Sequence, residues 1–551
     1  EKIVNRWLKK VFECPADKIM HNAQYDLGWI KRMGFTVNGR IIDTMLVASL
    51  LDENRFSYSL NALAYEHLGK TKSEKALVEA AREFGVDPKA EMWKMPAMYV
   101  GPYAEVDAVL TLELWNYFST MLGKEDLWNI ANIELDLLPC LVDMTMRGVR
   151  IDVNRVERTK DMLLKREKEV MKEIKRITGS SVEIWAAQSL SKAFDKLDIT
   201  YPKTEKGAPS FTKQFLNEHA HPVSKLIVEA RNLNKTSGTF INTIIKHCRA
   251  DGRIHSHINQ IRSDDGGTVS GRISMSNPNL QQIPARDPEL GPMIRSLFLP
   301  EEGEQWAAID YSQQEPRILV HYAHVYGKTR GIPLEGAAEF VEAYNTDPAT
   351  DFHTMVAEMT NIPRKQAKTI NLALMYGMGV NKMAESLDIT VEEAKKLVKQ
   401  YHNRVPFVKG LMTGVMNRLN ENSSAGALRS LGGRKCRFDM WEPDTFAMNK
   451  ALPYREAVST YGATTRLKRA YTYKALNRLI QASAADMTKK AMVALYKEGK
   501  LPLVQIHDEI AMSVKNVDEA NEIAKIMENV LPLEVPSKCD VEMGPSWGES
   551  M

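Results

Sequence analysis

The chain has 551 residues, of which 44% are hydrophobic, so it can bury several cores and we expect three or more domains or subdomains. Its 73 Lys and Arg residues nearly balance its 70 Asp and Glu residues, yet a formal charge of +3 does not exclude nucleic acid, because phosphate binding needs only a local basic groove. The sequence has no long apolar run, which argues against a membrane protein. Residues 1–12 lack the continuous hydrophobic core of a signal peptide. The five cysteines include no CxxC pair, which argues against a cysteine zinc site.

The first 120 residues alternate helical and strand-like pieces, a pattern typical of the α/β class. Within them, Ile41, Ile42 and residues 45–47 are apolar around Asp43. The chain begins with Glu rather than Met, which fits a fragment, a processed product or a shortened sequence. Residues 153–177 follow as a long, heavily charged helical pattern, and we expect an exposed arm whose charges are mostly solvated.

The middle of the chain combines loops with two helices that begin near prolines. Residues 253–285 are rich in Ser, Gly, Asn, Gln and Pro and predict loops and short strands. The segment WAAID (306–310) predicts a buried strand, and Pro316 fits the first turn of the helix after it. Pro363 begins a second predicted helix, which the glycines of residues 377–379 end.

The last third of the chain contains one clear helix start and one clear hairpin. Thr390 and Glu393 form a capping box that begins a helix. Residues 501–506 and 510–514 are apolar strands, and the HDE turn between them predicts a β-hairpin.

Two acidic residues, Asp310 and Asp508, each follow an apolar strand. A carboxylate in that position is held rigidly and can face a cleft. Two such groups can hold two divalent cations roughly 4 Å apart, as in-line phosphoryl transfer requires, and oxygen ligands suit Mg²⁺ or Mn²⁺. Taken alone, each Asp is explained as well by the end of a strand or by a turn.

Four residues of the predicted helix after Pro363 share one face, because they are spaced four apart: Arg364, Lys368, Leu372 and Tyr376. The two cations could grip a triphosphate, and the two larger apolar groups could pack on a sugar and a base. An ordinary amphipathic helix with solvated basic residues explains the same pattern. His353 is a further phosphate-binding candidate, although a lone histidine is more often structural.

Five segments occur in order along the chain: SGRISMSNPNLQQIPAR (270–286), DYSQQEPR (310–317), RKQAKTINLALMYG (364–377), NRLIQASAAD (477–486) and HDE (507–509). They resemble the motifs of the family A DNA polymerases, the bacterial DNA polymerase I type, and most of all its phage members. One such motif is weak, but five in order are specific. The resemblance implies an α/β and α+β multidomain fold, with the palm, fingers and thumb of a right-hand polymerase.

The resemblance also implies roles for individual residues. Asp310 and Asp508 would bind two Mg²⁺ or Mn²⁺ ions with help from the Tyr311 carbonyl, and Glu509 would be a nearby, less essential carboxylate. Lys368 would be the general acid. The residues that would contact the incoming dNTP are Arg364, Lys368, His353, Tyr376, Leu372, Gln313 and Glu315; among them Tyr376 would stack near the templating base and Glu315 would exclude a ribose 2′-hydroxyl.

A further set of residues would face the primer–template: Arg272, Gln281, Gln282, Asn477, Gln481, His507 and Lys235. Donors in the minor groove test the shape of a base pair without reading its sequence, because N3 and O2 acceptors are common to all correct pairs. The segment KTSG (235–238) resembles a thumb segment whose backbone contacts give affinity without sequence preference. Taken alone, each of these Gln or Asn residues is explained equally well as a loop residue whose side chain hydrogen-bonds to its own backbone.

Some positions depart from the family pattern. Leu372 stands where most members have Phe or Tyr, which predicts altered discrimination against dideoxynucleotides. Gln314 and Pro316 replace the usual Ile and Leu, so the pocket beside Glu315 is not standard. Residues 438–475 are longer than in the bacterial pattern, and the sequence gives no function for them.

The N-terminal region resembles the proofreading 3′–5′ exonuclease domain of the same family. Its second and third motifs are matched by HNAQYD (21–26) and YAEVD (103–107), which supply Asp26, Tyr103 and Asp107. The first motif, a strand with D-x-E, is not in the sequence. The resemblance therefore implies an incomplete RNase H-like domain, little or no proofreading, and a removed or separate N-terminal piece.

The expected domains are a partial exonuclease-like domain (1–122), the thumb and start of the palm (123–285), the first part of the palm (286–335), the fingers (336–470) and the second part of the palm (471–551). The expected partners are primer–template DNA, dNTPs and replication accessory proteins. The resemblance implies a monomer without membrane association that works in the bacterial host cytoplasm during phage DNA replication.

Two alternatives remain open. A single-subunit RNA polymerase shares the palm chemistry, but Glu315 argues against it, because an RNA polymerase must admit the 2′-hydroxyl. A non-catalytic primer–template-binding protein is the other alternative, and the presence of Asp310, Lys368 and Asp508 argues against it.

Overall fold

The computed structural model describes residues 2–550 apart from Ser73, 263–267, Arg286, Asp388, 422–424, Phe446 and Met448. Arg286, the last residue of the 270–286 motif, therefore lies outside the described residues, and the segments 253–285 and 438–475 are described in part. Within the described residues, no helix is both long and apolar enough to cross a bilayer. All five cysteines are free thiols.

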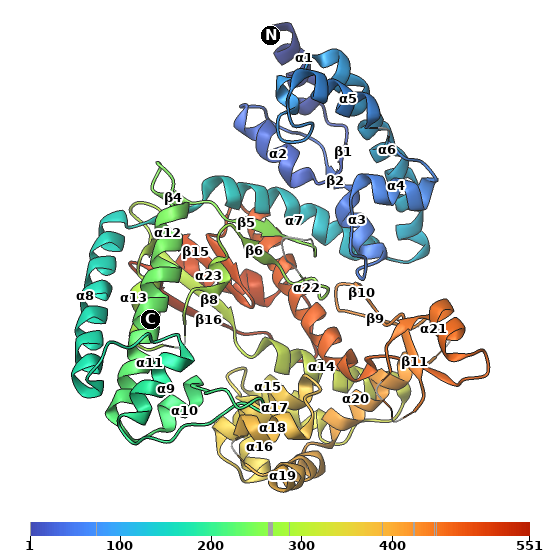
Figure 1. Cartoon of the computed structure of the whole chain (residues 1–551). Coiled ribbons are helices and arrows are strands. Elements are labelled where there is room, and N and C mark those ends of the chain that lie inside the picture. Colours follow the sequence, from blue (N-terminus) through green and yellow to red (C-terminus); the bar gives the residue numbers. More distant parts are fainter. Residues whose placement is uncertain are drawn as a thin grey trace.

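The N-terminal part, drawn in blue in Figure 1, packs helices around two short parallel strands, as the α/β pattern predicts. Its elements are α1 (Lys2–Glu13), β1 (Lys18–Met20), α2 (Ala23–Arg32), β2 (Ile41–Asp43), α3 (Thr44–Leu51), α4 (Leu60–Leu68), α5 (Lys75–Phe84), η1 (Met92–Lys94) and α6 (Ala97–Lys124). Buried Asp43 holds this part together, because its carboxylate accepts from the backbone N–H groups of Asn22, Ala23 and Met45. The carboxylate therefore ties the start of α2 to the start of α3.

The predicted long arm is α8 (Val153–Thr178), which ends at Gly179 in the left-handed conformation. It is not a bare arm, because its apolar stripe packs on α11 (Pro222–Lys235) and only its other face is solvated. Neighbouring elements are α7 (Trp128–Arg147), β3 (Val149–Ile151), α9 (Ala187–Asp195), α10 (Lys213–Glu218), η2 (Thr236–Ile241), α12 (Asn242–His247), β4 (Arg253–Ile254) and β7 (Phe298–Leu299). Strands β4, β3 and β7 form a three-stranded sheet in that order.

A four-stranded antiparallel sheet, which we call the central sheet, has the order β14-β15-β8-β16. Its strands are β14 (Val504–Ile506), β15 (Glu509–Val514), β8 (Gln305–Tyr311) and β16 (Cys539–Gly544). The predicted hairpin and the WAAID strand are both present. The first hairpin strand is shorter than predicted, and the turn consists of His507 and Asp508 alone, because Glu509 already pairs with Ile506.

Helices flank the central sheet and extend below it in Figure 1. They are α14 (Gln314–Arg330), α15 (Ala337–Thr346), α16 (Phe352–Thr360), α17 (Arg364–Met375), α18 (Val380–Leu387), α19 (Val391–Arg404), α20 (Pro406–Arg418), α22 (Ala475–Lys497) and α23 (Val517–Glu528). The predicted helix starts are confirmed: Pro316 lies in the first turn of α14, Pro363 precedes α17, and Thr390 and Glu393 form a capping box on α19.

The remaining elements connect these parts. Residues 253–285 contain β5 (His257–Asn259), β6 (Ser274–Ser276) and η3 (Leu280–Gln282), as predicted, and α13 (Leu290–Arg295) follows. The long 438–475 segment forms a small antiparallel sheet of β11 (Met440–Pro443), β12 (Leu452–Pro453) and β13 (Leu467–Arg469) with α21 (Tyr454–Tyr461) and η5 (Thr472–Lys474). Strands β9 (Ala427–Arg429) and β10 (Lys435–Arg437) precede it, and η6 (Trp547–Glu549) ends the chain.

Candidate active site

The central sheet brings the two predicted aspartates together. Asp310 lies at the end of β8, where its register partners are Glu509 on β15 and Asp540 on β16. Register partners point to the same face of a sheet, so these three carboxylates form a row. Asp508 adjoins the row, because its carbonyl accepts the backbone N–H of Tyr311 at 3.3 Å. Four acidic residues are thus neighbours at one end of the central sheet.

The charge of these groups is poorly compensated. Enclosure by the protein and the nearby carboxylates, with Asp508 the strongest, raise the pKa of Asp310 to about 8. Burial raises the pKa of Asp508 as well, although the charges of His507 and Arg272 oppose the shift. Each charged group that acts strongly on Asp310 is therefore an acid that repels its ionised form.

A site of this kind suits a hard divalent cation. Its donors are carboxylate oxygens, and a cation between Asp310 and Asp508 would relieve the repulsion that raises the pKa of Asp310. Within the part of the chain that the structure describes, no group of three or more His, Cys, Asp or Glu side chains is arranged around a common metal position. Oxygen donors of the kind that Asp310 and Asp508 supply suit Mg²⁺ or Mn²⁺.

Glu315, in the first turn of α14, connects three of the motifs. Its carboxylate accepts from Arg272 at 2.6 Å and from the hydroxyl of Tyr376 at 2.7 Å. Burial and the charge of Glu315 raise the pKa of Tyr376, so this hydroxyl stays protonated and keeps donating. The contacts fix the end of α17 beside the carboxylate row.

The predicted face of α17 is present: Arg364 and Lys368 are exposed, while Leu372 and Tyr376 are half-buried. Arg364 donates to both oxygens of Asp351, at 2.6 and 3.3 Å. Asp351 also caps α16 by accepting from the backbone N–H of Thr354. In this state a carboxylate therefore engages the guanidinium that is predicted to bind phosphate.

His353 lies in the first turn of α16 and is buried. The side-chain amide nitrogen of Asn371 is 2.8 Å from its Nδ1. Burial lowers the pKa of His353 to about 4, so the imidazole is neutral at pH 7. When the Asn371 amide donates to Nδ1, the proton of the neutral ring is on Nε2, which can then donate to an anion.

Two glutamines near Glu315 connect elements. The Gln313 side chain accepts from the backbone N–H of Phe352 at 2.7 Å and donates to the Thr350 carbonyl. It therefore positions the start of α16, which carries His353. Gln314 is buried and donates to Thr488 on α22. Its departure from the family pattern thus affects the packing of α14 on α22.

The predicted DNA-facing residues come from separate parts of the fold. The Gln281 amide donates to the carbonyls of Ile273 and Gln505, which places it beside the hairpin turn of exposed His507. Gln282 is exposed next to it, and Asn477 and Gln481 lie one turn apart, half-buried on α22. Lys235 is exposed at the end of α11, an element that carries none of the other predicted DNA-facing residues.

Four buried charges meet between α22 and the elements packed against it: Glu134, Arg434, Asp486 and Lys489. Arg434 contacts Asp486 at 2.7 Å and also pairs with Glu134, while Lys489 contacts Glu134 at 2.6 Å. Burial opposes the ionisation of Glu134, but Lys489 and Arg434 outweigh it and lower its pKa to about 2. We call this set the buried quartet; it joins α7, α22 and the loop before β10.

The exonuclease-like residues are partly brought together. Lys72 contacts the hydroxyl of Tyr103 at 2.7 Å and the carboxylate of Asp107 at 3.2 Å. Burial disfavours its charge, yet these two partners raise the pKa of Lys72. Asp26 lies on α2, where burial raises its pKa. The Tyr103 hydroxyl and the Asp107 carboxylate are therefore already paired with the ammonium group of Lys72.

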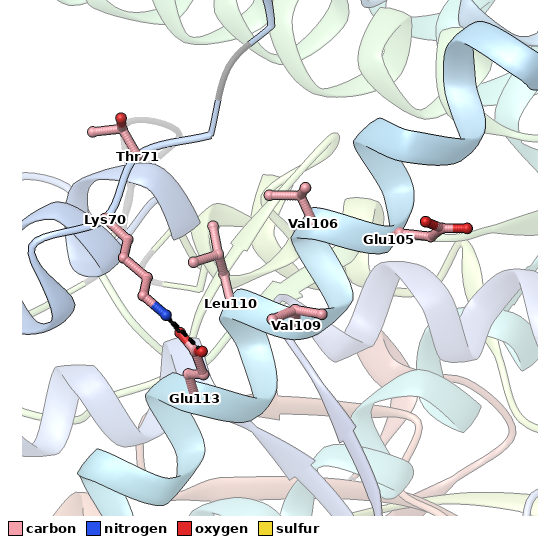
Figure 2. A pocket seen from close by; sticks show the side chains of 7 residues that line it. All are labelled: Lys70, Thr71, Glu105, Val106, Val109, Leu110 and Glu113. Atoms are coloured by element: carbon pink, nitrogen blue, oxygen red, sulfur yellow. Dashed lines mark hydrogen bonds and ion pairs between the residues drawn. The ribbon is translucent and has the colours of Figure 1, made fainter.

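An open hollow of about 540 Å³ lies between α6 and the chain after α4, and Figure 2 shows the side chains that line it. One wall is made by Val106, Val109 and Leu110, and the Lys70–Glu113 ion pair lies across it. None of its lining residues belongs to the polymerase motifs.

Sequence reasoning missed Asp540, Asp351 and Lys72. The only signal for Asp540 is the alternation of acidic and apolar residues in CDVEMG, which predicts a strand but not its neighbour. Asp351 was visible as a helix cap before His353. No local pattern predicts that Lys72 meets residues 103–107, because the contact depends on packing.

Comparisons with known proteins agree with these observations. The model of DNA polymerase family A matches residues 153–549, and that of a 3′–5′ exonuclease matches residues 3–123. A DNA-directed DNA polymerase of Pseudomonas phage M6 is 37% identical over 589 residues, which cover 98% of this chain and 84% of that protein. The thermostable DNA polymerase I of Thermus filiformis is 32% identical over 463 residues, 80% of this chain and 51% of that protein.

One solved structure is similar along the whole chain. The POL domain of Pol1 from M. smegmatis, in complex with DNA primer-template and dNTP, has a TM-score of 0.77 and covers 100% of this chain and 90% of that chain. At 24% identity this likeness speaks for the fold alone. Together the comparisons confirm the predicted resemblance and the right-hand polymerase fold with its exonuclease-like part.

Proposed function

Because this chain belongs to DNA polymerase family A, we propose that it extends the 3′ end of a primer with deoxynucleotides under the direction of a template strand. The observation that carries the proposal is the meeting of Asp310 and Asp508 at one end of the central sheet, beside Glu315 and the end of α17. Neither aspartate is explained by a local structural role alone, because the charge of Asp508 disfavours the ionised form of Asp310 and burial disfavours that of Asp508.

Asp310, Asp508 and the Tyr311 carbonyl would hold two Mg²⁺ ions, with Mn²⁺ as an alternative. When bound, these ions lower the pKa of the attacking hydroxyl and neutralise the leaving pyrophosphate. Glu509 has a lesser part, since it is register-paired to Asp310 but has Arg295 as a counter-charge.

The triphosphate would be bound by the exposed face of α17. Arg364 offers a planar fork for phosphate oxygens, and its release from Asp351 accompanies nucleotide binding. Lys368 binds as a point charge and gives a proton to the leaving group. His353 donates from Nε2, because Asn371 keeps Nδ1 occupied.

Glu315 would select the sugar. Arg272 and Tyr376 hold its carboxylate in place from two sides. A fixed carboxylate beside the sugar leaves no room for a ribose 2′-hydroxyl, which favours a DNA polymerase over the RNA polymerase alternative. Tyr376 would stack near the templating base, and Arg272, Gln281, Gln282, Asn477, Gln481 and His507 would follow the minor groove, with Lys235 on the backbone.

We further propose that the chain acts in phage DNA replication in the cytoplasm of a bacterial host, as a monomer with separate accessory proteins. The relative from a Pseudomonas phage supports this setting. The expected domain limits, 1–122, 123–285, 286–335, 336–470 and 471–551, remain part of the same proposal.

Primer extension with dNTPs and Mg²⁺ tests the function. The unchanged chain should extend a primer by the templated nucleotide, strongly prefer dNTPs to rNTPs, and stop when the metal is chelated. Asp310→Ala should lower the rate by at least about 1,000-fold, because it removes a ligand that acts on the transition state.

The matched control is Asp518→Ala, an exposed aspartate on α23 that should extend normally. Full activity of Asp310→Ala would refute the assignment. Binding of primer–template without any extension would favour the non-catalytic alternative.

For the exonuclease-like part, we infer that it removes a mispaired 3′ end slowly or not at all, because Lys72 neutralises Asp107 and holds Tyr103. Incubation of the chain with a mispaired primer and Mg²⁺ should leave the primer intact. Degradation that Asp107→Ala abolishes would contradict the inference.

A further inference from the structure

The 438–475 segment ends in a cluster of aromatic and basic side chains that the proposed function does not use. Tyr471 and Tyr473 expose 48% and 50% of their surfaces. The Lys474 ammonium lies 5.2 Å from the centre of the Tyr471 ring and 5.5 Å from that of the Tyr473 ring. We call these three residues the tyrosine clamp.

The backbone that carries the tyrosine clamp is held by specific contacts. Tyr471 adopts the left-handed conformation, with φ of 60°, which is uncommon for a residue with a side chain. The Lys474 N–H donates to the Tyr471 carbonyl and closes η5 directly before α22. On the other side, β13 is fixed by Arg469, which stacks 4.5 Å from the Trp441 ring and donates to the Phe438 carbonyl. Both exposed rings are therefore presented from a fixed base.

The clamp lies beside the end of α17. A Cβ atom on Gly377 would be 2.7 Å from the Tyr473 carbonyl and 3.5 Å from its ring. Only glycine allows this approach, and Gly377 directly follows Tyr376. The clamp also leads into α22, which carries Asn477 and Gln481. It therefore borders the position proposed for the templating base.

We propose that the tyrosine clamp binds the unpaired part of the template strand, stacking bases that have not yet reached the active site. Exposed rings with a cation are the means by which proteins hold single-stranded nucleic acid without sequence preference. Arg466 and Lys468, both exposed on the same segment, share one carboxylate, that of Asp444, at 3.3 and 3.6 Å. Two cations facing one anion leave a net positive charge for the phosphates. This inference rests on the proposed polymerase function.

Equilibrium binding of labelled primer–templates in Mg²⁺ without nucleotide tests the proposal. Three templates differ only in the 5′ overhang: the templating base alone, about six nucleotides, and the same length with abasic sites beyond the templating base. The unchanged chain should bind the long overhang on the order of 10-fold more tightly than the short one, and the abasic overhang should lose most of this gain, because phosphates alone do not stack.

In the double variant Tyr471→Ala/Tyr473→Ala, the gain from the long overhang should fall to about 2-fold or less, whereas Tyr471→Phe/Tyr473→Phe should keep it. The control pair Tyr25→Ala/Tyr65→Ala removes two tyrosines of the N-terminal part that are even more exposed, at 64% and 68%, and should behave as the unchanged chain. Thermal unfolding verifies that each variant is folded.

Two results would overturn the clamp: an unaltered overhang preference in the double alanine variant, or equal affinity for the intact and the abasic overhang. A chain that extends primers but shows no overhang preference refutes the clamp alone. A chain that neither binds nor extends any primer–template refutes the proposed function, and the two failures are therefore distinguishable.

Discussion

Asp310 shows at the residue scale how a functional group can oppose stability. Its pKa of about 8 in the folded chain lies above the ordinary value of 3.8, so the folded state keeps a proton that the unfolded state loses. Stability from this group is complete below about pH 4 and is lost as the pH rises towards 8. Without a bound metal, Asp310 therefore costs stability at neutral and alkaline pH.

We accordingly expect Asp310→Asn to stabilise the metal-free chain at pH 8.5 and to change it little at pH 4.5. The gain should not exceed about 1 kcal/mol, because the Asp310 side chain reaches solvent. Urea unfolding in a chelating buffer at the two pH values measures the difference. Equal stability of the two chains at pH 8.5 would show that the repulsion is relieved by other means.

Leu372 is the residue-scale departure from which we expect the clearest functional consequence. It is half-buried on the α17 face, one turn before Tyr376, at the position where the resemblance predicts Phe or Tyr in most family members. A smaller side chain changes the floor beneath the sugar. Leu372→Tyr should therefore alter the ratio of ddNTP to dNTP incorporation severalfold, measured by single-nucleotide extension, while Leu374→Met should not. An unchanged ratio of ddNTP to dNTP incorporation would contradict this prediction.

At the scale of elements, α17 and the β14–β15 hairpin illustrate two kinds of predictability. The helix is bounded by Pro363 and Gly377, and the hairpin turn by two apolar strands, so both could be located from local patterns. The function of each depends on a partner element. Glu315 on α14 holds the end of α17, and β8 places Asp310 beside the turn. Small errors in boundary, such as the shorter β14, leave these contacts unaffected.

On the scale of the whole molecule, the buried quartet joins parts that are distant in sequence. Glu134 belongs to α7, Arg434 to the loop before β10, and Asp486 and Lys489 to α22. Gly271 and Gly432 allow this packing, since Cβ atoms there would be 2.5 Å from Arg434 and 2.7 Å from Asp486. The quartet thus fixes the 270–286 motif and α22 against one another.

Arg434→Met should destabilise the chain by about 3–5 kcal/mol, because it leaves two buried carboxylates with one lysine. Chemical unfolding measures the loss. The control Arg176→Met removes an exposed ion pair on α8 and should leave the unfolding transition unchanged. A loss no greater than that of the control would mean that the quartet is not energetically coupled.

The sequence by itself determined the chemistry: the five ordered motifs, the aspartates after apolar strands, the cationic face of α17 and most helix and strand positions follow from neighbouring residues and backbone preferences. Only the tertiary structure decided which side chains meet. The row of Glu509, Asp310 and Asp540 depends on the strand order β15-β8-β16, and the contacts of Lys72 and of the tyrosine clamp depend on how packed elements approach. Such pairings are set by the burial of complementary apolar faces far apart in the chain, which no local pattern records.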